Sequence, residues 1–158
     1  MPKNPYRRNI MKEIIVSDLA PWSETKWLVL SSCFMLVPAG YAYRRGMLLH
    51  SAVLTAASLF SMNYWRHAKY GWRRNVDFVV AKSTFLLFFY TGIHHIQHIT
   101  SHSWFIPLTS IYLFYKSKIL YNKQDVCWVN YHMLFHLFGS IQSIIVIQEC
   151  CKKCLYTR

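Results

Sequence analysis

Five apolar runs, separated by short polar or basic segments, dominate the pattern of hydrophobic and polar positions along the chain. They cover residues 27–43, 47–65, 77 to about 93, 104–121 and 127–147. Each run is close to the roughly 20 residues that a helix needs to cross a bilayer, where a helix satisfies its own backbone hydrogen bonds. The pattern therefore predicts an all-α fold, a polytopic transmembrane helical bundle of about five spans.

The segments outside these runs are short and predict no second folded domain. Residues 1–26 contain three prolines, five cations and three acidic residues, and are expected to form a cytosolic or interfacial N-terminal tail. Within this tail, residues 9–19 have the mixed pattern of a short amphipathic helix on the bilayer surface. Residues 27–148 form the predicted transmembrane bundle, and residues 149–158 a short basic, cysteine-rich C-terminal tail.

The composition fits a membrane protein and argues against nucleic acid as a partner. Charged residues make up 15% of the chain, and its formal net charge is +12. A soluble domain usually has about 25% charged residues. The cations gather at the ends of the apolar runs, where cations contact anionic head groups in membrane proteins. Membrane lipids are therefore the expected partners, while protein partners stay open.

The distribution of Lys and Arg predicts the orientation of the bundle. With five spans, twelve of these cations fall on the side of the N-terminus and five on the opposite side, so the N-terminus is expected to be cytosolic. The C-terminal cysteines Cys150, Cys151 and Cys154 lie beside lysines in a pattern typical of S-palmitoylation. Acylation would require the cytosolic side, which conflicts with the charge count. We follow the charge count and leave acylation open.

A basic, aromatic segment joins the second and third runs and ends in Asp77, the only acidic residue between Glu24 and Asp125. Its cations Arg66, Arg73 and Arg74 are typical of anchors at the membrane surface. A second interpretation is a clamp for lipid head groups, because Arg binds phosphate through two parallel hydrogen bonds. Asp77 is expected to pair with Arg73 or Arg74.

Several polar residues are expected at one depth of the bilayer, because consecutive spans run in opposite directions. Ser61, His67, Asp77, His132 and His136 all fall toward the same membrane face. His132 and His136 are four residues apart, so they share one face of a helix and suit two ligands of one zinc ion. The alternative is that they form hydrogen bonds with neighbouring helices.

A second group of histidines follows the third run. His94, His98 and His102 repeat every four residues, and His95 lies beside them. The spacing would form a stripe on a helix and would suit a surface metal or a response to pH. Exposed histidines in the interfacial connector are the alternative.

Ser61 at the end of one span, Asp77 opening the next, and the pair His132-x3-His136 in the last span together form a recognisable pattern. The pattern resembles the CREST superfamily, which includes alkaline ceramidases and the progestin and adipoQ receptors. In that family three histidines hold zinc, and a metal-bound water attacks a lipid amide or ester. The resemblance implies zinc ligation by His132 and His136, with Asp77 acting on the water and Ser61 stabilising the oxyanion.

The resemblance covers residues 58–78 and 128–140, and two features of the sequence depart from the family. Trp65 stands one turn after Ser61, where the family has a histidine. His67 is the nearest substitute as third zinc ligand. The family has seven spans, whereas five are predicted here.

Three functional hypotheses follow. The first is a zinc-dependent lipid amide or ester hydrolase, or a degenerate relative of one. The second is a non-catalytic membrane scaffold or assembly protein whose polar residues join helices. The third is a lipid- or ion-handling protein that uses the basic loop at residues 66–74.

Overall fold

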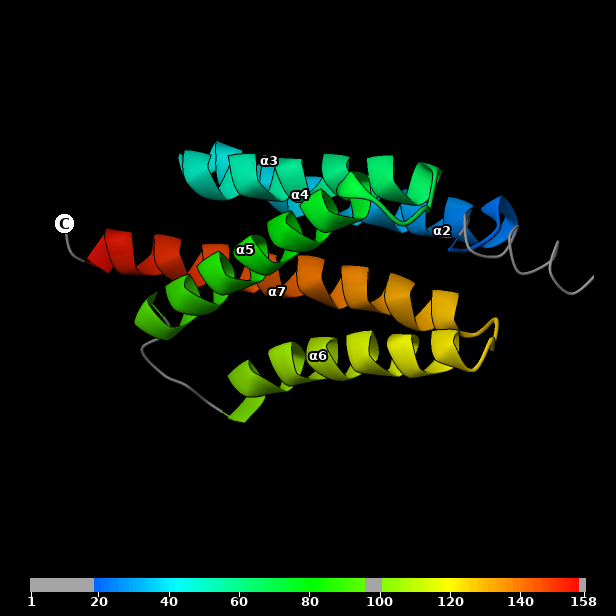
Figure 1. Cartoon of the computed structure of the whole chain (residues 1–158). Helices are drawn as coiled ribbons and strands as arrows, with labels where there is room; N and C mark the ends of the chain where they lie inside the picture. The colour runs from blue at the N-terminus through cyan, green and yellow to red at the C-terminus, as the bar shows by residue number, and fades with distance from the viewer. Residues whose placement is uncertain (1–18, 96–100, 157–158) are drawn as a thin grey trace, which may run out of the picture.

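In the residues that it describes, 19–95 and 101–156, the computed structural model contains helices joined by short loops and no strand, and this confirms the predicted all-α class (Figure 1). The elements are α2 (Trp22–Ser32), the 3-10 helix η1 (Cys33–Met35), α3 (Leu36–Arg44), α4 (Leu48–Arg66), α5 (Trp72–His95), α6 (Ser101–Asn122) and α7 (Trp128–Tyr156). The backbone stays helical from α2 through η1 into α3. These three elements therefore form one rod.

Two prolines shape this first rod. Pro21 precedes α2 in an extended conformation, with φ −69° and ψ 153°, and the helix begins at Trp22 rather than at residue 27 as predicted. Pro38 lies in the first turn of α3. Because proline has no N–H, the α-helical bond from residue 38 to the carbonyl of Phe34 cannot form. The tighter turn of η1 lies directly before it.

Helix α7 is the central element of the bundle. It packs against α2, η1, α3, α5 and α6, whereas α4 packs against the first rod and α5. Figure 1 shows α5 crossing α7 obliquely and α6 running alongside it. Among the described elements α6 packs on α7 alone, so α7 joins the α6 helix to the rest of the fold.

Two hydrophobic clusters lie at opposite ends of α7. One is built around Val146 and Ile147, and the other around Trp128 and Val129. The stretch of α7 between them carries buried polar side chains, among them His136 and Ser140. The middle of the bundle is therefore polar, between two apolar layers.

Two helices are long and apolar enough to cross a membrane: α5 over Trp72–His94 and α7 over Trp128–Lys152. Both extend beyond the predicted runs. Because α5 begins at Trp72, Asp77 lies in its second turn and not at its start. Since α7 continues to Tyr156, the segment predicted as a C-terminal tail prolongs the last helix. These two helices support association with a membrane.

Some predictions concern parts of the chain outside the described residues. The predicted surface helix of residues 9–19 is one of them, apart from Leu19. His98 also lies outside, as do the side chains of His95, His102 and Cys154. His94, which is described, packs its ring on Tyr90 with ring centroids 4.3 Å apart.

Candidate functional site

Two adjacent serines on α2 connect three helices. Ser31 Oγ lies 2.8 Å from Nδ1 of His136 on α7, and the Ser32 hydroxyl donates to Ser61 Oγ on α4 at 3.0 Å. Ser31 is 0% exposed and Ser32 is 1% exposed. The Ser58 hydroxyl adds a second bond between α4 and α2 by donating to the Ser32 carbonyl at 2.9 Å. The side chains of Ser31 and Ser32 thus bridge α4 and α7.

Ser61 also lies beside Asp77 of α5, so the polar residues reach a fourth helix. Within the described residues, Asp77 forms no ion pair with Arg73 or Arg74, so the expected pairing is not present. The Arg73 guanidinium lies over the Trp72 ring, 5.7 Å from its centroid. Asp77 is half-buried and lies beside Ser61 of α4.

His132 and His136 lie together on α7, with ring centroids 4.9 Å apart. A serine from a neighbouring helix approaches Nδ1 of each ring: Ser31 for His136, and Ser117 of α6 for His132, at 3.4 Å. In the described part of the chain, neither ring has a hydrogen bond at Nε2. Hydroxyl contacts at Nδ1 fix the orientation of an imidazole and leave Nε2 available.

We call these six residues the polar network: Ser31, Ser32, Ser61, Asp77, His132 and His136. It contains four of the five residues that were expected at one depth of the bilayer. The fifth, His67, caps the end of α4 and is exposed, outside the network.

Trp65 of α4 packs against the polar network beside His132. Its side chain is 8% exposed, and its ring centroid lies 5.1 Å from that of His132 and 5.9 Å from that of Trp128. Trp65 is the residue one turn after Ser61, where the resemblance implies a histidine. Among the described residues no group of three or more His, Cys, Asp or Glu side chains is arranged to hold a metal ion. An indole therefore packs against the histidine pair where a third imidazole is expected.

The arginines predicted to bind lipid head groups lie beside the polar network, not in it. Arg66 ends α4, and Arg73 and Arg74 are in the first turn of α5, so all three flank the loop between these helices. Arg66 and Arg74 are exposed. The Arg74 guanidinium lies 5.0 Å from the centroid of the Tyr70 ring.

Three residues of the site were not predicted: Ser31, Ser32 and Ser117. Each lies inside an apolar run, where a serine also serves to let helices approach closely. The signal that could have found the first two is their adjacency, because two hydroxyls inside a span need polar partners. The sequence could not show that those partners are on α4 and α7.

Comparisons of the chain with protein-family models, with curated proteins and with solved structures give no match. The functional assignment is therefore based on the contacts of the polar network. Every enclosed side-chain nitrogen or oxygen of the described residues has a hydrogen-bond partner. Such an arrangement joins α2 to α4 and to α7, and its two most buried hydroxyls are closed to a substrate.

Replacing Ser31 with alanine is expected to lower the free energy of unfolding by about 1–2 kcal/mol. The substitution leaves Nδ1 of His136 buried without its partner, and the strongest interhelical hydrogen bonds measured in membrane proteins are worth about 1.7 kcal/mol. SDS titration of the purified protein, followed by circular dichroism, measures the change. Ser143→Ala is the matched control, because Ser143 is also buried but donates to Gly139 within α7. Equal losses in the two variants would contradict the bridging role of Ser31.

Proposed function

We propose that the chain is a multi-pass integral membrane protein of about five spans. Five helical units support this, and so do the large apolar side chains on their outer faces. Leu48, Leu49, Leu86, Phe105 and Leu108 are each at least 60% exposed. A surface of this kind is a liability in water, whereas lipid chains solvate it in a bilayer.

The proposed orientation has the N-terminus in the cytosol. The start of α2, the α4–α5 loop and the α6–α7 loop lie toward the same end of the bundle (Figure 1). That end carries Lys26, Arg66, Lys69, Arg73, Arg74 and Lys123, and Lys116 and Lys118 lie in the last two turns of α6 next to it. The opposite end carries Arg44, Arg45 and Lys152. The positive-inside rule favours the richer end as the cytosolic one.

We infer that the protein is a non-catalytic membrane scaffold and a degenerate relative of zinc-dependent lipid hydrolases. The observation that carries this inference is the packing of Trp65 on His132, with ring centroids 5.1 Å apart. A catalytic zinc ion takes three protein ligands and a water molecule. An indole cannot replace an imidazole as a zinc ligand, so His132 and His136 provide two of the three protein ligands and the third is missing. Its remaining role is to join helices, which the hydrogen bonds of the polar network serve.

A zinc-dependent hydrolase of lipid amides or esters is the second candidate, and one observation favours it. Both imidazoles are held at Nδ1 by serines, and both Nε2 atoms lack a hydrogen bond within the described residues. Every enclosed side-chain nitrogen or oxygen of these residues has a hydrogen-bond partner. The two Nε2 atoms have none, so they are not enclosed. In this case His132 and His136 would hold a zinc ion that activates water, while Asp77 and Ser61 would orient it.

Zinc content per chain separates the two candidates. We expect detergent-purified wild-type protein, measured by atomic emission after incubation with zinc, to retain far less than one ion per chain. The His132→Ala/His136→Ala variant is expected to match it. About one zinc in the wild type, lost in a double variant that keeps its helical content, would overturn the scaffold assignment and favour the hydrolase.

A further inference from the structure

A single lysine lies in the middle of the apolar stretch of α5. Lys82 is the only Lys, Arg, Asp or Glu between Asp77 and Lys116. It is ten residues from Trp72 and twelve from His94, the two ends of the stretch that is long enough to cross a membrane. At about 1.5 Å per residue, Lys82 lies about 15 Å from one end of this stretch and about 18 Å from the other. The charge is therefore near the middle of the proposed span.

The Lys82 side chain is exposed on the outside of the bundle. Its Nζ atom lies 4.1 Å from the centroid of the Phe78 ring, one turn earlier on the same helix. A reach of one turn, roughly 5.4 Å, does not bring the ammonium group out to either end of the span. A charge at such a depth is costly in lipid, and in membrane proteins it is found with a partner.

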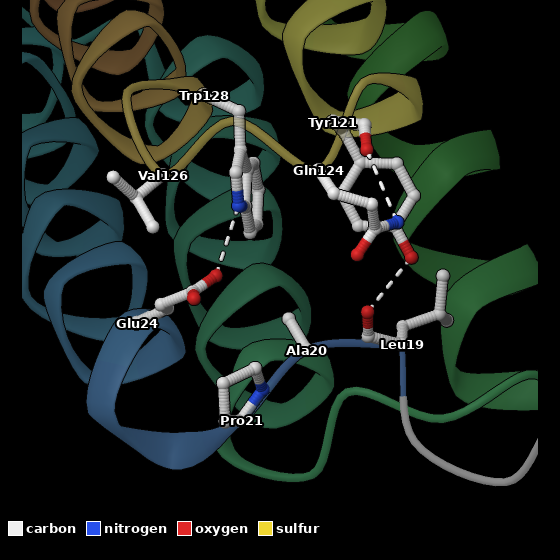
Figure 2. A pocket seen from close by; sticks show the side chains of 8 residues that line it. All are labelled: Leu19, Ala20, Pro21, Glu24, Tyr121, Gln124, Val126 and Trp128. Carbon is white, nitrogen blue, oxygen red and sulfur yellow. Dashed lines mark hydrogen bonds between the residues drawn. The ribbon is translucent and has the colours of Figure 1, made fainter. Parts of the chain in front are cut away.

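The described part of the chain does not provide that partner. Its carboxylates lie near helix ends or in a loop: Glu24, Asp77, Asp125 and Glu149. None of them forms an ion pair with Lys82. Glu24 accepts a hydrogen bond from Trp128 Nε1 at 2.9 Å, at the basic end of the bundle (Figure 2). Glu149 pairs with Lys152 at 2.6 Å. The partner of Lys82 must come from outside these residues.

The exposed face of α5 around Lys82 has the spacing of a contact between two helices. Its residues alternate in steps of four and three: Val79, Ser83, Leu86, Tyr90 and Ile93. Steps of this kind form the seam of two helices that pack at a shallow angle. The small side chain of Ser83, in this seam, lets a second backbone approach closely. Lys82 flanks the seam, at a position whose charges set the choice of partner in paired helices.

Charge complementarity identifies the kind of helix that fits this face. A second copy of the chain does not fit, because copies share one orientation in the membrane and a two-fold contact would bring one Lys82 against the other. Residues 1–26 contain no apolar run of about 20 residues that could supply a further span. A spanning helix with one Asp or Glu at the depth of Lys82 complements the ammonium group.

We propose that this face of α5 binds a transmembrane helix of another membrane protein, one with an Asp or Glu near the middle of the bilayer that pairs with Lys82. The inference rests on the proposed function, since it requires α5 to span the membrane. It gives the proposed scaffold a partner of defined chemistry.

Binding of a designed helix to the full-length protein tests this proposal. The probe is a synthetic transmembrane peptide of Leu and Ala with one central Glu, and its twin has Gln at that position. The central position gives the same depth in either orientation of the peptide. Energy transfer between fluorophores on the protein and on the peptide measures association in phosphatidylcholine vesicles. We expect the Glu peptide to bind about tenfold more tightly than its twin, the scale of the strongest polar contacts between membrane helices.

Substitutions on α5 locate the site. Lys82→Leu is expected to remove the preference for the Glu peptide, and Lys82→Arg to keep it. Ser83→Trp keeps the charge and blocks close approach, so it is expected to weaken binding of the Glu peptide. Lys118→Leu is the matched control, because Lys118 is also an exposed lysine but is in the last two turns of α6.

A preference that persists in Lys82→Leu, or that the wild type lacks, would overturn the proposal. Loss of the preference in vesicles that contain phosphatidylglycerol would also overturn it, because Lys82 would then bind a lipid phosphate. Carbonate extraction of the vesicles separates this inference from the proposed function. Protein that carbonate removes does not span the membrane, and both would fail. Protein that stays in the vesicles without preferring the Glu peptide would overturn this inference alone.

Discussion

Replacing Trp65 with alanine is expected to cost about 3–5 kcal/mol of the free energy of unfolding, the largest loss from any single substitution considered for this chain. Trp65 is 8% exposed and packs on three rings, those of Tyr64 at 4.5 Å, Trp128 at 5.9 Å and His132 at 5.1 Å between centroids. The loss is one of packing contacts and of a filled volume.

SDS titration followed by far-ultraviolet circular dichroism measures this loss without relying on tryptophan fluorescence. Trp22→Ala is the matched control, because Trp22 begins α2 and is 57% exposed. Its substitution is expected to change the free energy of unfolding by about 0.5 kcal/mol or less. A loss for Trp65→Ala no larger than that of the control would show that the contacts of the Trp65 ring with Trp128 and His132 add no stability.

The all-helical class was predictable because long apolar runs alternate with short polar segments along the chain. The helix ends were less predictable. The sequence predicts a start near Asp77 for the third helix, since the apolar residues begin there, but α5 begins at Trp72. A helix that is already formed continues into the polar segment because its next turn satisfies further backbone groups. The same reason extends α7 to Tyr156, through residues predicted as a tail.

The contacts of the site were predictable only in part. Helical spacing places His132 and His136 on one face, and span order places Ser61 and Asp77 at one depth. Which face of each helix points inward is a tertiary property that a single sequence does not contain. Arg73 and Asp77, four residues apart on α5, were therefore expected to pair. Asp77 instead lies beside Ser61, while the Arg73 guanidinium lies over the Trp72 ring.

Replacing Trp65 with histidine is expected to create a zinc site in this chain. Trp65 packs on His132, and the rings of His132 and His136 have centroids 4.9 Å apart. That separation allows both Nε2 atoms to reach one ion at roughly 2.0–2.1 Å. A third imidazole from α4 would complete the three protein ligands that zinc requires. We expect zinc content to rise to about one ion per chain.

Added zinc is also expected to raise the unfolding temperature of Trp65→His and not that of the wild type, because an ion that binds only the folded state stabilises it. Trp65→Phe is the control for the change in volume and is expected to bind no zinc. Adding His136→Ala to Trp65→His should abolish the gain. If Trp65→His folds but takes up no zinc, then His132 and His136 are not positioned to share an ion. The histidine pair would in that case be a helix contact alone, with no relation to a metal site.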